Sequence, residues 1–308
     1  MGEFLGCETS VRIVVLGSAA GGGFPQWNCL CPVCQLAWAG DKRVKPRTQS
    51  SLAISSDGEK WLLLNASPDL RQQILASHQL HPRGAKRQSP IAAVFVTNGD
   101  VDHLTGLLTL REQQSFTLFG SKATLAQVSG GLFGVLNKEL VHTVPVTLDK
   151  PIDTGLGITV TPFAVPGKVP LYLEGAKVDI GTEDESTVGL EITDGTKTMF
   201  YIPGCAEVTP KVQERIKGAD LLFFDGTTFT DDEMVQLGLS PKTAYRMGHV
   251  AMSGENGSLS RLADLGIGRK IYVHINNTNP ALIEDSPERK SVEKAGWDVS
   301  YDGMEVTL

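Results

Sequence analysis

The sequence lacks an excess of positive charge: 28 lysines and arginines stand against 35 aspartates and glutamates, a net charge of −7. Proteins that bind nucleic acid present a basic face to the phosphates, so this balance excludes general nucleic-acid binding. No apolar run approaches the roughly 20 residues that cross a bilayer. Residues 1–10 lack the basic start and apolar centre of an export signal. We therefore expect a cytoplasmic protein with no membrane insertion.

Cysteine is also scarce, and an odd total of five does not suit a disulfide framework. Three of them, Cys29, Cys31 and Cys34, fall within six positions, and Pro32 stiffens the turn between them. Thiolates this close together can converge on one soft metal ion, which predicts a structural zinc knuckle at about 27–36 with a fourth ligand from elsewhere. A redox cluster or three unrelated buried thiols are the competing interpretations.

The order of the expected elements favours an α/β protein. With 308 residues, 41% of them hydrophobic, the chain can form one large domain, and no linker or internal repeat divides it. We therefore expect a single domain over 1–308, with two packed mixed sheets and helices outside. The expected strands are 11–16, 52–55, 61–65, 91–96, 116–119, 157–165, 169–178, 187–193, 197–202, 219–224, 270–274, 297–301 and 304–308. The expected helices are one capped by Ser67 and others at 104–112, 122–128, 208–217, 256–265 and 287–295.

The stretch 97–104 carries the densest chemistry. It follows a buried, β-branched run at 91–96 and precedes a helical stripe over 104–112. Adjacent Asp102 and His103 thus fall in a turn beyond a strand end, where open α/β sheets place their sites. A carboxylate beside an imidazole is a half-site for zinc or ferrous iron. The alternative is that Asp102 caps the helix and His103 is an ordinary, partly buried histidine.

Two more polar residues end predicted buried strands: Asp225 follows 219–224, and His274 closes 270–274. Residues so placed tend to converge on one edge of a sheet. One carboxylate and two histidines with open positions make up the site typical of non-haem iron. Asp102, His103 and His274 supply that set.

The run Thr-Asn-Gly-Asp-Val-Asp-His at 97–103 resembles the T-H-x-H-x-D-H signature of the metallo-β-lactamase fold, a four-layer αββα sandwich. Longer stretches at 16–29, 47–51, 65–73 and 274–280 resemble the PqqB family of pyrroloquinoline quinone (PQQ) biosynthesis over nearly the full length.

The chain departs from the hydrolases of this fold. Asn98 and Asp100 stand where the first two signature histidines belong, no histidine occurs at 165–168, and Cys205 takes the place of the metal-bridging aspartate. One metal subsite is therefore largely dismantled. Because a pair of metals that clamps a hydrolytic water needs both subsites, hydrolysis becomes the less expected chemistry.

The resemblance implies an iron-dependent hydroxylase that uses O₂ and acts on the tyrosine ring of a Glu-Tyr dipeptide or a related precursor fragment, alongside other PQQ pathway enzymes. It implies Fe(II) on Asp102, His103 and His274, with His249 as a further active-site residue that binds substrate or shuttles protons, or is merely structural. In related proteins a histidine three residues after the last metal histidine completes the zinc knuckle, and Asn277 occupies that position. The candidate substrate-binding residues are Arg71, Arg111, Asp100 and Asp225; Asp100 and Asp225, like Asn98, also qualify as orienting residues or substitute ligands.

Two other functions remain open from the sequence. The first is a metal-dependent hydrolase inherited from the fold. The second is a carrier that binds PQQ or its precursor and helps its transport to the periplasm.

Overall fold

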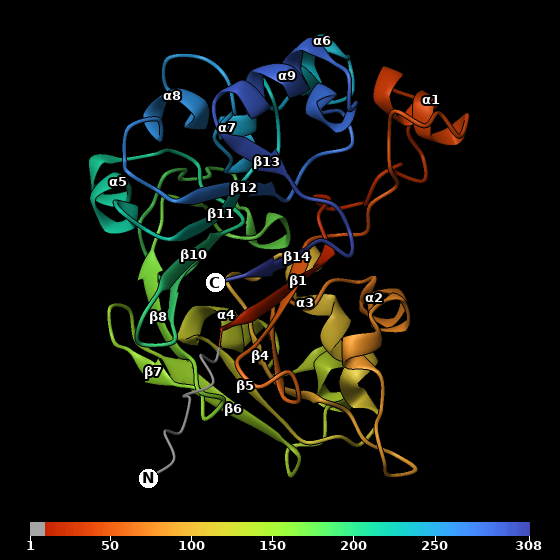
Figure 1. Ribbon diagram of the computed structural model, residues 1–308, viewed down its shortest axis with the longest axis vertical. Helices are drawn as coiled ribbons and strands as arrows, with labels where there is room; N and C mark the ends of the chain where they lie inside the picture. The colour runs from red at the N-terminus through yellow and green to blue at the C-terminus, as the bar shows by residue number, and fades with distance from the viewer. Residues whose placement is uncertain (1–9) are drawn as a thin grey trace, which may run out of the picture.

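The computed structural model describes residues 10–308, so the absence of an export signal expected over residues 1–10 falls almost wholly outside the described residues. Two mixed sheets of seven strands each pack face to face, with helices on their outer sides (Figure 1). The α/β fold class predicted from the sequence, with its αββα layering, is confirmed. Within residues 10–308, no helix combines the length and the apolar character that a bilayer crossing requires.

The two sheets have matching topologies. In the first, neighbouring strands are antiparallel from β14 to β3 and parallel from β3 to β6; its order is β14 (Glu305–Thr307), β1 (Arg12–Gly17), β2 (Ser51–Ser55), β3 (Trp61–Leu64), β4 (Ile91–Phe95), β5 (Phe116–Ser121) and β6 (Val141–Val146). In the second, β13 to β10 run parallel and β10 to β7 antiparallel; its order is β13 (Trp297–Val299), β12 (Arg269–Val273), β11 (Leu221–Asp225), β10 (Thr198–Ile202), β9 (Val188–Thr193), β8 (Thr159–Ala164) and β7 (Ile152–Asp153).

Central strands such as β3 and β11 read as nearly continuous apolar runs because they are buried on both faces. In β3, Leu62 and Leu64 point into the core between the sheets, whereas Trp61 and Leu63 point to the outer helical layer. In β11 the same alternation sends Phe223 inward and Phe224 outward. Each such side chain contributes about 1.5–3 kcal/mol by leaving water, so the two sheets are held firmly and their strand ends form a fixed platform.

The helices are short. They are α1 (Pro32–Trp38), α2 (Leu70–Ala76), α3 (Val101–Leu104), α4 (Lys122–Gln127), α5 (Pro210–Ile216), α6 (Glu233–Gln236), α7 (Ala244–Met247), α8 (Ser258–Arg261) and α9 (Pro287–Lys294). The 3₁₀ helices are η1 (His78–Leu80), η2 (Thr105–Arg111), η3 (Gly131–Val135), η4 (Leu171–Leu173) and η5 (Pro280–Leu282). Figure 1 shows α5 to α9 gathered over the second sheet and α2 beside the first.

Three predictions about local structure are wrong. The strand expected at 169–178 is a surface segment that contains η4; its alternating Leu171 and Leu173 are exposed and pair with no strand. The helix expected at 104–112 is the 3₁₀ helix η2, because Gly106 lies tight against the backbone at Ser67 and Ala66. Ser67 does not cap α2 at its first turn, since the residue before that helix is Asp69.

Candidate metal centre

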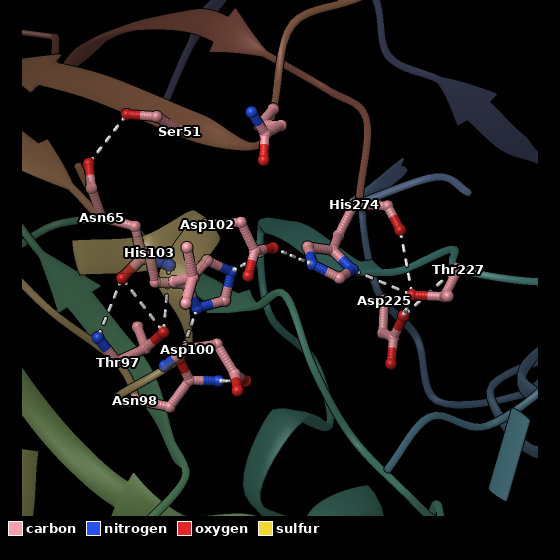
Figure 2. Close-up of polar contacts among 12 residues, drawn as sticks. Ser51, Asn65, Thr97, Asn98, Asp100, Asp102, His103, Asp225, Thr227 and His274 are labelled. Carbon is pink, nitrogen blue, oxygen red and sulfur yellow. Dashed lines mark hydrogen bonds and ion pairs between the residues drawn. The ribbon is translucent and has the colours of Figure 1, made fainter. Parts of the chain in front are cut away.

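The strand ends bring the predicted ligands together, as expected. Asp102 and His103 lie on α3, just beyond β4, while His274 directly follows β12 in the other sheet. His274 Nε2 is 3.0 Å from Asp102 Oδ2, and His103 Nε2 is 3.8 Å from the same oxygen. Figure 2 shows the Asp102 carboxylate between the two imidazoles.

These spacings fit one metal ion. Nitrogen and oxygen ligands bound at about 2.1 Å lie about 3.0–3.4 Å apart around an octahedral or tetrahedral ion. All three ligand atoms of Asp102, His103 and His274 lie within 4.8 Å of one another. Nε2 of His103 is moreover buried without any hydrogen-bond partner among the described residues. A buried ring nitrogen without a hydrogen-bond partner costs folding free energy unless its lone pair binds another group, and a metal ion can be that group.

The tautomer of His103 follows from its other nitrogen. Nδ1 lies 2.6 Å from Asn98 Oδ1, an acceptor only, so Nδ1 donates and Nε2 keeps its lone pair. Burial lowers the pKa of His103 to about 4, although the charge of Asp102 opposes that shift. Asn65, in left-handed conformation with φ 62°, holds Thr97 at the start of the loop through its side-chain amide. His103 is therefore fixed in position and neutral, as a ligand must be.

His274 is held from behind by Thr227. Its Nδ1 is 2.9 Å from Thr227 Oγ1, and the same hydroxyl lies 2.7 Å from Asp225 Oδ1. His274 has φ 56°, a left-handed backbone conformation that non-glycine residues rarely adopt and that clusters at functional sites. Burial by itself lowers the pKa of His274, but the hydrogen bond and charge of Asp102 raise it above the ordinary value.

Asp225 accepts four hydrogen bonds and is fully buried. Its donors are the backbone N–H of Cys205, the backbone N–H and hydroxyl of Thr227, and Nδ1 of His249 at 2.7 Å. Both carboxylate oxygens of Asp225 thus already accept hydrogen bonds from protein groups, and a role for Asp225 in substrate binding stays a prediction. Its position orients His249 and, through Thr227, His274.

His249 joins the centre as expected. Its ring stacks on that of His274 with centroids 5.1 Å apart, and its side chain is partly exposed. A cavity of about 530 Å³ opens beside it, lined also by Tyr245 and Asn256. Since Asp225 takes Nδ1, the Nε2 atom is the one left for substrate or solvent.

At the position of the fold's second metal subsite, the side chains present form hydrogen bonds with other protein groups. Asn98 uses its side-chain oxygen on His103 and its nitrogen on Asp100 Oδ2, 2.9 Å away. Burial raises the pKa of Asp100, and the charge of Asp102 raises it further. The thiol of Cys205 donates to the carbonyl of Glu207. Asn98, Asp100 and Cys205 therefore supply no imidazole for a second ion at this position.

The three cysteines form a compact cluster at α1. Their sulfurs lie within 4.8 Å of one another, and Cys31 caps the helix ahead of Pro32. The side-chain amide nitrogen of Asn277 lies 3.2, 3.8 and 3.3 Å from Cys29, Cys31 and Cys34. On a tetrahedral zinc, a ligand oxygen and a thiolate sulfur are about 3.5 Å apart, so Asn277 occupies the expected fourth vertex. A half-turn of the amide puts its oxygen there.

Neither predicted arginine has a contact at the centre. Arg111 donates to the carbonyl of Leu108 and pairs with Glu112 at the surface, and Arg71 is exposed on α2. Their role in substrate binding stays a prediction. Thr227 was missed from the sequence, although its place two residues after the end of a buried strand, next to Asp225, is a usable signal.

Comparisons with known proteins agree with this fold. The family described as "Beta-lactamase superfamily domain" matches residues 60–275. The chain is 58% identical over 299 residues to coenzyme PQQ synthesis protein B of Methylorubrum extorquens (strain PA1), covering 97% of this chain and 100% of that protein. The crystal structure of Zn²⁺-bound PqqB from Methylobacterium extorquens is 58% identical, with a TM-score of 0.95 and coverage of 96% and 100%. A diphosphatase of the PhnP family, 21% identical with a TM-score of 0.68 over 97% of each chain, shares the fold.

Proposed function

This chain belongs to the coenzyme PQQ synthesis protein B family of the beta-lactamase superfamily, and we propose that it serves PQQ biosynthesis as an iron- and O₂-dependent hydroxylase. The substrate is the tyrosine ring of a Glu-Tyr dipeptide or a related precursor fragment. The observation that carries this proposal is the set of Asp102 Oδ2, His103 Nε2 and His274 Nε2, with the buried His103 nitrogen unpartnered. One carboxylate and two imidazoles with open positions suit non-haem iron.

Asp102, His103 and His274 would hold Fe(II), which when bound supplies the redox chemistry that activates O₂ for insertion into an aromatic ring. Overall, one oxygen atom enters the ring and the other leaves as water, with two electrons from an external reductant. Asn98 and Thr227 keep the two imidazoles in their ligating tautomers. His249, oriented by Asp225 and facing the cavity, is placed to take or return a proton at Nε2.

The cysteine cluster supports a second, structural role for metal. Cys29, Cys31 and Cys34 would hold Zn(II), with the side-chain oxygen of Asn277 as fourth ligand after an amide half-turn. Asn277 lies three residues beyond His274, so this zinc would tie α1 to the loop that carries an iron ligand. Cysteines that bind a metal instead of forming disulfides are typical of a reducing compartment, which favours a cytoplasmic location.

A hydrolase is less well supported, because the second subsite is occupied by the hydrogen bonds of Asn98 and Cys205. Asp100, which the sequence offered for substrate binding, lies beside that subsite and accepts from Asn98. A carrier of PQQ or its precursor would use the same cavity but would consume no O₂.

The test is anaerobic loading of the zinc-containing protein with Fe(II), then exposure to O₂ and a reductant with Glu-Tyr, followed by mass spectrometry. A gain of one oxygen atom that His274→Ala abolishes supports the proposal. His142→Ala is the matched control, since His142 is exposed on β6 and should leave the product unchanged. Product formation without iron, or none from iron-loaded protein that binds Glu-Tyr, would overturn the hydroxylase and favour a carrier.

A further inference from the structure

The segment 168–174 lies across the loop that leads to the metal ligands. The hydroxyl of Tyr172 donates to the carbonyl of Gly99 at 2.8 Å. A side-chain carbon at Gly99 would meet Pro170 at 2.8 Å and the Tyr172 hydroxyl at 3.3 Å. This surface segment, expected as a strand, therefore packs directly on the turn between Asn98 and Asp102.

Lys168 links this segment to His249. Its aliphatic stem passes Gly248 so closely that a built Cβ there would be 3.1 Å from Cγ of the lysine. Gly248 has φ 90° and directly precedes His249, so the lysine crosses the backbone that carries this histidine. The Lys168 ammonium then reaches Glu174, 2.9 Å away.

Glu174 gathers three cations. Besides Lys168, its carboxylate binds Arg246 at 3.0 Å and lies 3.8 Å from the ammonium of Lys242. Three positive charges against one negative charge leave two unbalanced. Arg246 belongs to α7, which ends immediately before Gly248 and His249. The excess charge is therefore at the side of the catalytic centre, not on a remote surface.

The donors of this cluster are not all used. Lys242 is beyond hydrogen-bond distance of Glu174, and its ammonium has no other side-chain partner among residues 10–308. Lys242 and Arg246 are about one-third exposed, whereas Glu174 is only 9% exposed. Both terminal nitrogens of Arg246 already donate to Glu174, at 3.4 and 3.0 Å. Lys242 and the remaining N–H groups of Arg246 can still bind a second carboxylate from outside.

We propose that Lys168, Lys242 and Arg246 form a carboxylate-binding subsite for the substrate, in which Glu174 partly neutralises the cations until the substrate carboxylate arrives. This inference rests on the proposed function, since it names the group that anchors the substrate beside His249. It also replaces Arg71 and Arg111 as the residues expected to recognise the substrate carboxylates.

The test measures binding alone, by calorimetry on protein loaded with Zn(II) at both metal sites, so that no turnover is required. Glu-Tyr is compared with its C-terminal amide and with the form whose glutamate side chain is an amide. At least one amide should bind about tenfold more weakly, because it loses a charge-assisted hydrogen bond. The double variant Lys242→Gln/Arg246→Gln should weaken Glu-Tyr by a similar factor and remove the difference between acid and amide.

Two further variants separate binding from a structural role. Lys177→Gln is the charge-matched control, because Lys177 lies nearby in the chain but is highly exposed and pairs only with Asp179. It should leave affinity unchanged. Glu174→Gln raises the net charge of the cluster from two to three and should tighten the binding of Glu-Tyr. A purely structural network gives the opposite sign, since the same change loosens the segment 168–174.

The outcomes are distinct. Equal affinity for acid and amides, no Glu-Tyr binding to the wild-type protein, or weaker binding by Glu174→Gln overturns the subsite. If Glu-Tyr binds with the acid preference but is not hydroxylated by iron-loaded protein, the subsite stands and the proposed reaction fails. If hydroxylation proceeds while acid and amides bind alike, the reaction stands and the subsite fails.

Discussion

Replacing Thr227 by valine removes one hydroxyl behind the metal centre while keeping the shape of the side chain. That hydroxyl is 2.9 Å from Nδ1 of His274 and 2.7 Å from Oδ1 of Asp225, and Thr227 is buried. Valine leaves the His274 N–H without an acceptor, which costs about 1–3 kcal/mol of folding free energy. Loss of a group that orients a metal ligand lowers metal affinity about 10–100-fold, or about 1.4–2.8 kcal/mol.

The assay is an anaerobic Fe(II) titration against a coloured chelator, with zinc already bound at the cysteine cluster so that only the second site is measured. Thr227→Ser is the control, because serine retains the hydroxyl and should bind iron nearly as well as the wild type. Thermal unfolding of the metal-free proteins reports the folding cost separately. If Thr227→Val binds iron as tightly as Thr227→Ser, the hydroxyl does not orient His274, and the reasoning from Figure 2 is refuted.

Three other predictions follow from the same structure. Cys31→Ser should lose zinc on dialysis and unfold at a lower temperature. Because Asn277 contacts Cys31 and lies near His274 in the chain, the substitution should also weaken iron binding. Metal analysis and Fe(II) titration measure the two effects, and an unchanged iron affinity would show that the two sites are independent. In the metal-free protein His103 should stay neutral down to about pH 4, since burial lowers its pKa from 6.5. Below about pH 6.5 the unfolded chain binds a proton at this histidine while the folded protein does not. The free energy of unfolding should therefore decrease by about 1.4 kcal/mol per pH unit as the pH falls from about 6.5 to about 4. Ring-proton NMR measures that midpoint, and a value near 6.5 contradicts the burial argument. Burial raises the pKa of Cys205 far above its ordinary value, and its thiol donates to the carbonyl of Glu207. In the folded protein at pH 8, Cys205 should therefore react only slowly with an alkylating reagent. Rapid labelling of its peptide, measured by mass spectrometry, would contradict this.

The positions of Asp102, His103 and His274 could be predicted because these residues follow strands whose last residues are apolar and buried. Runs such as 91–96 and 219–224 predict buried strands, and the carboxyl ends of parallel strands lie at the same edge of a sheet. The sequence thus placed Asp102, His103 and His274 beyond strand ends. Their meeting also depends on how the two sheets pack, because β4 and β12 belong to different sheets. The same reasoning placed Asp225 at the centre but could not show which donors surround its carboxylate. Thr227 is only two residues away, but Cys205 and His249 are 20 and 24 residues away and no local pattern connects them to it.

The structure of the segment 168–174 could not be predicted from its local pattern. Alternating apolar residues at Val169, Leu171 and Leu173 have the period of a strand, yet the segment pairs with none and lies over Gly99 instead. Strand formation needs a free partner edge, and availability of an edge is a property of the assembled sheet. Likewise, arginines near the motif drew attention in the sequence, whereas the cations beside His249 are Lys168, Lys242 and Arg246.

The sequence by itself determined the two-sheet architecture, the ligand types and the cysteine cluster, because periodicity, strand ends and residue chemistry are local properties. Only the tertiary structure decided which groups hold those ligands in place, that Asn277 reaches the three sulfurs, and which cations gather on Glu174. Contacts such as Asn277 with Cys34 and Arg246 with Glu174 join residues far apart in the chain, so they depend on how the whole core packs.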